Sequence, residues 1–155
     1  MRNIFFHLAC WCPGALGLFL RQKVYPYFLG SCGRKVLFGR HTRLYGGKSI
    51  HIGENSVISD NVTLDGRHGD GTAPVISIGS QVFIGAGSSL RGRGERIVIG
   101  RGSSLGSFCL ISSRCPVILE EDVLLAAFCR LGLLPRGEWG RLEQGGTPEI
   151  TLGKG

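Results

Sequence analysis

The sequence is poor in charged residues, and most of the charge that it carries has one sign. Charged residues make up 19% of the 155 positions, and eighteen lysines and arginines stand against eleven acidic residues. With 43% hydrophobic residues, this balance excludes an intrinsically disordered chain, because such chains combine high net charge with few apolar residues. The net charge of +7 favours anionic partners such as nucleotide phosphates, phosphosugars, acidic lipids or nucleic acid.

The chain also lacks an uninterrupted apolar stretch of the length that crosses a bilayer. Its most apolar segment, residues 4–20, is broken by His7, Pro13 and Gly14, whereas a spanning helix needs about 20 apolar residues in a row. No clear small-x-small signal-peptide cleavage site precedes Arg21 and Lys23. We interpret this segment as one or two helices that cap the fold. The alternative is peripheral contact of residues 4–28 with a membrane that carries a lipid-linked sugar.

The six cysteines lack the spacing of a zinc site, because the chain contains no C-x2-C pair. Cys10 and Cys12 form a C-x-C without further ligands nearby, which we interpret as structural. We expect reduced thiols and a cytoplasmic location, with no bound metal.

An aliphatic residue recurs every six positions through much of the chain. A period of six fits neither one helix nor one strand. Extra residues enter only after every third repeat, so we expect three short strands to form one triangular coil with all insertions at one corner. The sequence predicts a parallel β-helix with coils about 4.8 Å apart. The expected inward ladder is Ile52, Ile58, Leu64, Ile78, Ile84, Leu90, Ile99, Leu105, Ile111, Leu119, Leu125, Leu131 and Leu152.

The residue four places after most ladder residues is also compact. Cys109, Cys115 and Cys129 occupy such positions, and we interpret these three cysteines as small packing residues.

The repeat, together with "PGALGLFLRQKVYPYFLGSCG" and "IHIGENSVISDNVTLD", resembles the hexapeptide-repeat acyltransferases, and among them the bacterial sugar O-acetyltransferases. The resemblance implies an all-β fold, a left-handed parallel β-helix with a short N-terminal helical segment. We expect a helical cap over residues 1–35 and the β-helix over 36–155, truncated at its C-terminus because the last coil has only begun.

The activity that the resemblance implies is transfer of an acyl group, most simply acetyl, from coenzyme A to a sugar hydroxyl in polysaccharide biosynthesis. The acceptor is then a small sugar or a lipid-linked sugar, and the assembly is a homotrimer. The co-substrate is acetyl-CoA or another acyl-CoA.

The general base of this family is a histidine, in a loop that follows a segment like "LLAAFCRLG". The corresponding loop here, residues 133–149, contains no histidine. Of the four histidines, His68 is the best placed, because Asp65 and Asp70 lie near enough in sequence to orient its imidazole. We expect His7 to pack in the apolar N-terminal stretch, and His41 and His51 to face solvent.

Substrate contacts are expected from the long insertion at residues 133–149. An insertion of this length in an economical repeat is often functional, and its expected binding residues are Arg136, Glu138 and Trp139. A set of arginines is expected to line one side and meet phosphates, with a solvated face as the alternative: Arg91, Arg93, Arg96, Arg101 and Arg114.

Two other functions compete with acyl transfer. The missing loop histidine favours a catalytically inactive or truncated β-helix repeat protein or scaffold. The zinc carbonic anhydrases of the same fold need several histidines across a subunit interface, and the spacing of His41, His51 and His68 does not match them. Nucleic-acid binding rests on charge alone, because no motif interleaves basic residues with aromatic ones, and we set it aside.

Overall fold

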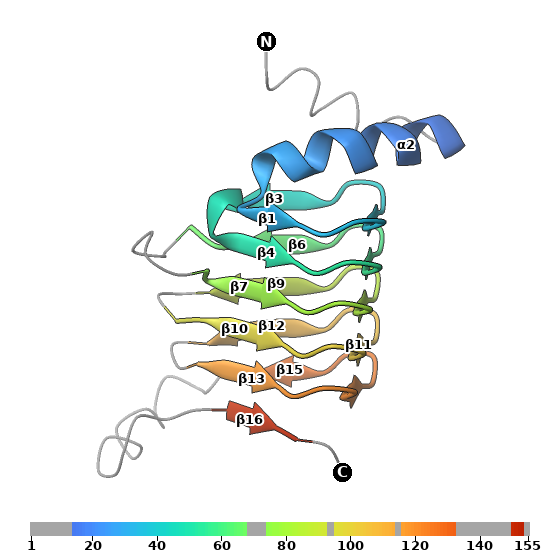
Figure 1. Cartoon of the computed structure of the whole chain (residues 1–155). Helices are drawn as coiled ribbons and strands as arrows, with labels where there is room; N and C mark the ends of the chain where they lie inside the picture. Colours follow the sequence, from blue (N-terminus) through green and yellow to red (C-terminus); the bar gives the residue numbers. More distant parts are fainter. Residues whose placement is uncertain (1–13, 68–73, 93–94, 114–115, 133–149, 154–155) are drawn as a thin grey trace, which may run out of the picture.

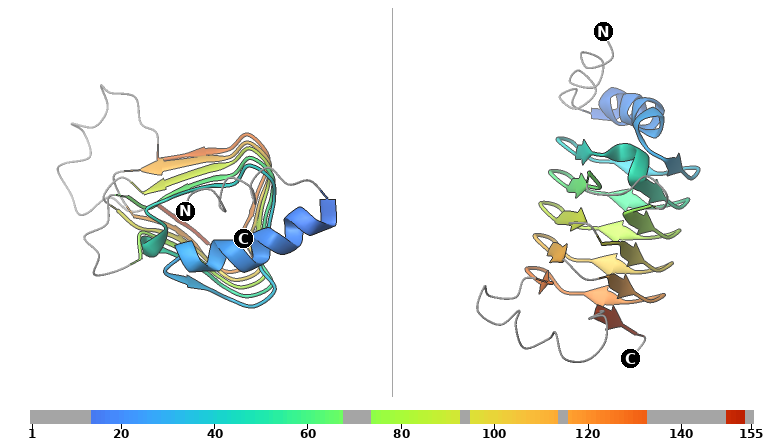
Figure 2. Two further views of the ribbon diagram at one scale, coloured as in Figure 1. Left: turned by 90° about the horizontal axis from the view of Figure 1, so that it is seen from above. Right: turned by 90° about the vertical axis from the view of Figure 1, so that its left-hand side faces the viewer.

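A computed structural model describes residues 14–67, 74–92, 95–113, 116–132 and 150–153. The chain forms a left-handed parallel β-helix in which three short strands make each coil and the coils stack along one axis (Figure 1). Seen along that axis, the coils superimpose as a triangle with three flat sides (Figure 2). The predicted fold class is confirmed.

Each side of the triangle is one parallel sheet. Sheet A contains β1 (Ser31–Cys32), β4 (Ile50–Ile52), β7 (Ile76–Ile78), β10 (Ile97–Ile99), β13 (Val117–Leu119) and β16 (Ile150–Leu152). Sheet B contains β2 (Leu37–Phe38), β5 (Val57–Ile58), β8 (Phe83–Ile84), β11 (Ser104–Leu105) and β14 (Leu124–Leu125). Sheet C contains β3 (Arg43–Tyr45), β6 (Thr63–Asp65), β9 (Ser89–Gly92), β12 (Leu110–Ser113) and β15 (Arg130–Leu131).

We number the coils from the N-terminus, so that coil 1 contains β1, β2 and β3 and coil 5 contains β13, β14 and β15. The corners are named after the sheets that they join. The breaks in the six-residue spacing fall between a sheet C strand and the following sheet A strand, at the C–A corner, as the spacing of the repeats predicted.

The predicted ladder forms the core. In sheet B, Ile58 pairs with Ile84, Ile84 with Leu105, and Leu105 with Leu125. The ladder residues of coils 2 to 4 are at most 3% exposed, and burial of such side chains stabilises a fold by about 1.5–3 kcal/mol each. Leu125 in coil 5 is partly buried and packs against this core.

The ladder also extends into coil 1, although the sequence predicts it only from Ile52 onward. Cys32 pairs with Ile52, Phe38 with Ile58, and Leu44 with Leu64. The six-residue spacing continues there, but a cysteine and a phenylalanine replace the aliphatic residues.

Three buried serines join neighbouring coils within the core. The hydroxyl of Ser103 donates to the Glu120 carbonyl at 2.8 Å and accepts from the Val123 N–H at 3.1 Å. Ser88 makes the same pair of contacts with the Gly106 carbonyl and the Cys109 N–H. Cys109 itself is 1% exposed, which confirms it as a packing residue.

The N-terminal segment covers the open end of coil 1 (Figure 1). It consists of α2 (Gly14–Val24) and the 3-10 helix η1 (Tyr25–Phe28). Gly17, Arg21 and Tyr25 are buried and recur every four residues, so they share the face toward the coil.

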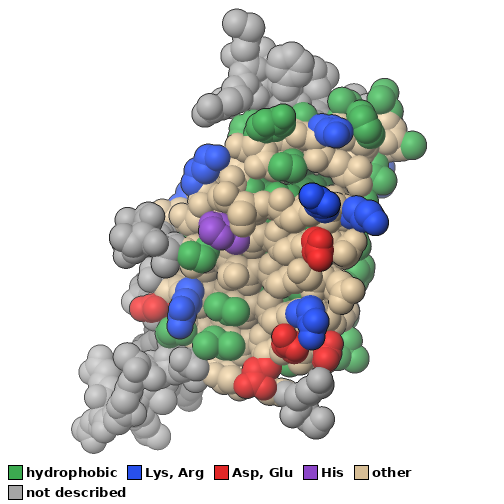
Figure 3. Space-filling view, viewed as in Figure 1, with side chains coloured by type: hydrophobic (Ala, Val, Ile, Leu, Met, Phe, Trp, Pro, Cys, Tyr) green, Lys and Arg blue, Asp and Glu red, His purple; other side chains and the backbone are tan. Residues whose placement is uncertain are grey.

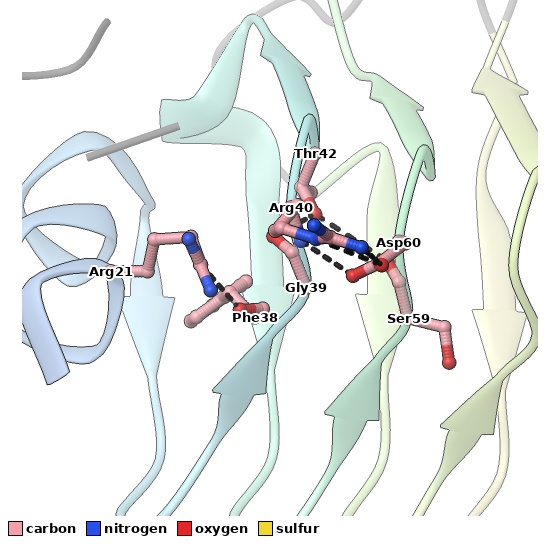
Figure 4. Close-up of polar contacts among 7 residues, drawn as sticks. All are labelled: Arg21, Phe38, Gly39, Arg40, Thr42, Ser59 and Asp60. Atoms are coloured by element: carbon pink, nitrogen blue, oxygen red, sulfur yellow. Dashed lines mark hydrogen bonds and ion pairs between the residues drawn. The ribbon is translucent and has the colours of Figure 1, made fainter. Parts of the chain in front are cut away.

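Two side chains fasten this cap to coil 1. Arg21 Nε donates to the Phe38 carbonyl at 2.8 Å (Figure 4). The Tyr25 ring is fully buried and meets the Phe38 ring edge-on at 4.9 Å. Among the described residues, no helix has both the length and the apolar character needed to cross a membrane.

Candidate functional site

The C–A corner of coils 1 and 2 holds a groove of about 420 Å³ beside the cap. Its wall comes from η1, from the 3-10 helix η2 (Gly47–Ser49), and from the residues that follow β6. It is lined by Tyr27, Phe28, Gly46, Gly47, Lys48, Ser49, Gly66 and Arg67. The groove therefore lies where the first insertion leaves the β-helix.

Lys48 brings one positive charge to this groove and ties η2 to the cap. Its ammonium group donates to the carbonyl oxygens of Tyr27 and Leu29, each at 3.3 Å. A cation at the end of a helical turn is favourable, because the last carbonyls of the turn carry partial negative charge. Tyr27 itself is 81% exposed, so its ring is accessible from the groove.

Arg67 brings a second positive charge and is held from two sides. Its Nε and Nη2 donate to the Asp65 carboxylate at 2.9 and 2.7 Å, and its guanidinium carbon lies 4.8 Å from the Tyr45 ring centroid. The hydrogen bond to Asp65 raises the pKa of Arg67 above its usual value. The guanidinium is therefore oriented, but its Nε/Nη2 edge is engaged by the Asp65 carboxylate, which balances its charge.

The expected base and substrate contacts lie outside the described residues. These are His68, which directly follows Arg67 in the chain, and Arg136, Glu138 and Trp139 in the long insertion.

Two other histidines lie on separate parts of the surface. His41 is exposed at the B–C corner, in the left-handed conformation with φ of 53°. His51 lies on the outer face of β4 and is half-buried against Gly30, where an added Cβ would come within 2.6 Å of its Nε2. Within the described residues, no three His, Cys, Asp or Glu side chains gather into a set that could hold a metal ion.

The arginines that were expected to line one side of the β-helix lie on different sheets and corners. Arg91 lies on β9 in sheet C, where it donates to the Ser89 hydroxyl, and Arg96 precedes β10 at the C–A corner. Arg101 lies at the A–B corner and pairs with Glu121 at 3.3 Å. Arg93 and Arg114 lie outside the described residues.

Lys48 and Arg67 were not singled out from the sequence. Both flank glycine-containing turns at the ends of sheet C strands, and such turns at the insertion corner were the available signal. Lys48 and Arg67 line one groove because they come from neighbouring coils. The spacing of the repeats predicts that the coils stack, but it does not predict which surface side chains meet.

No protein-family model and no curated protein sequence matches the chain. Among solved structures, a hexapeptide-repeat-containing acetyltransferase from Vibrio cholerae O1 biovar eltor, complexed with acetyl coenzyme A, matches with a TM-score of 0.53 and 21% identity. The match covers 86% of this chain and 81% of that one. A second structure of a Vibrio cholerae hexapeptide-repeat-containing acetyltransferase matches with a TM-score of 0.45 and 20% identity, over 86% of this chain and 84% of that one. At 21% identity the first match establishes a shared fold: this chain has the hexapeptide-repeat β-helix that is also found in an acetyltransferase.

Proposed function

We propose that this protein is a coenzyme A-dependent acyltransferase that transfers an acyl group, most simply acetyl, to a sugar hydroxyl. The observation that carries the proposal is the fold shared with an acetyltransferase whose structure contains acetyl coenzyme A. The groove at the C–A corner adds support, because Lys48 gives it positive charge and Tyr27 an exposed ring. Charged and aromatic groups of this kind suit phosphorylated or sugar ligands.

Direct transfer needs one base and no covalent enzyme intermediate. The base takes the proton of the acceptor hydroxyl as its oxygen attacks the thioester carbonyl carbon. The tetrahedral intermediate carries its negative charge on the former carbonyl oxygen, which donors must stabilise. It collapses by breaking the carbon–sulfur bond, and the departing thiolate recovers the proton from the base.

We assign the base to His68 and the acceptor to the groove. His68 follows Arg67, a lining residue of that groove, while the Asp65 carboxylate is engaged by Arg67. Arg136, Glu138 and Trp139 are the proposed further contacts to substrate. The expected assembly is a homotrimer in the cytoplasm, and exposed Leu16 and Phe19 on α2 agree with peripheral contact near a lipid-linked acceptor.

The test combines binding and turnover on the full chain. Titration calorimetry should detect binding of acetyl-CoA, and mass spectrometry should detect an acetylated sugar from a panel of acceptors. We expect His68→Ala to lower kcat by about 10²–10⁴ without changing the dissociation constant of acetyl-CoA. His41→Ala is the matched control and should retain the full rate. No detectable acetyl-CoA binding would contradict the proposal, and full activity of His68→Ala would remove His68 as the base.

A catalytically inactive β-helix protein or scaffold is the second candidate. It is favoured by the absence of histidine from residues 133–149, the loop that carries the base in the acyltransferases this sequence resembles. This candidate predicts no acetylated product with any acceptor in the panel. For the same reason we expect slow turnover even if the first candidate is correct.

A further inference from the structure

Two cysteines lie side by side at the B–C corner of coils 4 and 5. In sheet C, Leu110 pairs with Arg130. The residues that precede this pair, Cys109 and Cys129, are therefore in register on neighbouring coils. The Leu110 N–H donates to the Cys129 carbonyl at 2.9 Å, which fixes this register where the chain leaves the corner.

The spacing of the coils matches what a disulfide requires. Paired strands lie about 4.7–4.9 Å apart, and the Cα atoms of a disulfide lie about 4.4–6.8 Å apart. Burial raises the pKa of the Cys109 thiol, and a hydrogen bond between the side chains of Cys109 and Cys129 contributes to the same shift. The two thiols are therefore in contact, and neither forms a disulfide in this structure.

Packing at this corner does not require sulfur. The equivalent positions in coils 1, 2 and 3 hold Thr42, Val62 and Ser88. All three are fully buried, so a hydroxyl or a methyl group fills the position equally well. Only coils 4 and 5, of the five coils described, place one thiol next to another.

The two cysteines differ in their access to solvent. Cys109 is 1% exposed and its thiol donates to the Ala126 carbonyl at 3.2 Å, whereas Cys129 is partly exposed. The preceding residues, Phe108 and Phe128, stack their rings at 5.4 Å with an angle of 11° between the planes, which holds the two corners together. An oxidant that arrives from solvent therefore meets Cys129 first, with Cys109 behind it.

We propose that Cys109 and Cys129 form a reversible disulfide when the protein meets a peroxide, and that this disulfide fastens coil 5 to coil 4. The Cys129 thiolate attacks one peroxide oxygen, the O–O bond breaks, and a sulfenic acid and a hydroxide result. The Cys109 thiolate then attacks the sulfenic sulfur, so the S–S bond forms, the S–O bond breaks and a second hydroxide leaves. The two protons that the thiols gave up convert both hydroxides to water. Two thiols are thus oxidised and one peroxide is reduced, and a dithiol reductant reverses the change.

The surroundings of Cys129 favour a small, uncharged oxidant. Its partial burial hinders the approach of a bulky molecule. Figure 3, which views sheet A, shows acidic side chains gathered toward the last coils. Coil 5 has three acidic residues and one basic residue, namely Glu120, Glu121, Asp122 and Arg130. Hydrogen peroxide is small and uncharged, whereas glutathione disulfide is larger and anionic, and negative charge on coil 5 opposes its approach.

A covalent link has most to add at coil 5. The ladder residues Leu125 and Leu131 are only partly buried there, unlike those of coils 2 to 4. A disulfide that closes a loop of about twenty residues stabilises the folded chain mainly by restricting the unfolded one. The inference concerns these thiols alone and does not rest on the acyl-transfer proposal.

Peptide mapping without reduction tests the pairing on the folded full chain. The protein is treated with stoichiometric hydrogen peroxide, the remaining thiols are blocked, and tryptic peptides are identified by mass spectrometry. Cys115→Ser is the starting chain, because cleavage at Arg114 and Arg130 leaves Cys115 on the peptide of Cys129. We expect the peptides of Cys109 and Cys129 to be linked with the loss of two hydrogens, and dithiothreitol to separate them.

Two variants in this chain make the test specific. Cys129→Ser should abolish the link. Cys32→Ser is the matched control and should keep it, because the partner of Cys32 on the next coil is Ile52 and not a cysteine. The linked protein should unfold at a thermal midpoint about 5 °C higher than the reduced protein, and peroxide should not raise the midpoint of Cys129→Ser.

Three results of the mapping would overturn the proposal. These are oxidation of Cys129 to sulfinic acid without a link, a link from Cys109 to another cysteine, and a link that forms only in denaturant. An unchanged midpoint of the linked protein would overturn the fastening of coil 5.

Discussion

The buried serines show how single residues set the stacking of coils. These serines are Ser56, Ser88 and Ser103. Each lies four residues after a ladder residue and is fully buried. A buried hydroxyl is tolerated only when its hydrogen bonds are made. Because both partners of each hydroxyl lie on the next coil, the serines stabilise one register between coils.

Removal of one such hydroxyl should destabilise the fold measurably. In Ser103→Ala the Val123 N–H and the Glu120 carbonyl each lose their contact to the hydroxyl within the core. We expect the free energy of unfolding to fall by about 1–3 kcal/mol in chemical denaturation. Ser104→Ala is the adjacent control, on the outer face of β11, and should change stability by less than about 0.5 kcal/mol. Equal effects of the two substitutions would contradict the role of the buried hydroxyl.

The ladder residues stabilise the fold through burial of their side chains. Leu105 is fully buried between Ile84 and Leu125. Leu105→Ala should lower the free energy of unfolding by about 2–5 kcal/mol, through lost burial and the cavity that remains. Leu124 lies on the neighbouring strand β14 of sheet B but is 77% exposed. Leu124→Ala should therefore lower the free energy of unfolding far less than Leu105→Ala. An unchanged denaturation midpoint for Leu105→Ala would show that the register is wrong.

At the scale of elements, the N-terminal helices act as the cap of a repeat protein. The first coil presents an open sheet edge and an apolar interior, both of which would otherwise meet water. α2 covers this end with Arg21 bonded to the Phe38 carbonyl, and η1 inserts the Tyr25 ring beside Phe38. The Tyr25 hydroxyl also donates to the Thr42 carbonyl at 3.3 Å, so Tyr25 joins the cap to two residues of coil 1.

Loss of the Tyr25 ring should detach the cap. We expect Tyr25→Ala to reduce the free energy of unfolding by about 3–5 kcal/mol, because a fully buried aromatic ring leaves a large cavity. Hydrogen exchange should increase first in α2 and coil 1. Tyr27→Ala, two residues further on and 81% exposed, is the control for loss of an aromatic ring in η1. Protection of α2 that is unaffected by Tyr25→Ala would contradict this account of the cap.

At the scale of the whole molecule, the coils form a stack in which each contacts its neighbours. The core runs along the axis as a continuous ladder, and the stability of such a chain is close to a sum over coils and the interfaces between them.

The part of the fold that could be predicted follows from a repeated local pattern. Each of the ladder positions from Ile52 to Leu119 shares the same chemistry and spacing, so the register was predictable without coordinates. Coil 1 was missed because Cys32 and Phe38 fill ladder positions with side chains of other types. The groove was missed for a different reason, since Lys48 and Arg67 are separated by a full coil in sequence.

Periodicity alone determined that this chain stacks triangular coils and that its insertions leave at one corner, because burial of a side chain at every sixth position repeats the same physical demand. Only the tertiary structure decided which surfaces result. It brought Lys48 and Arg67 to one groove and stacked the rings of Phe108 and Phe128 on each other. Such surface groupings depend on neighbours in adjacent coils, about twenty residues away in sequence, and no local burial pattern constrains them.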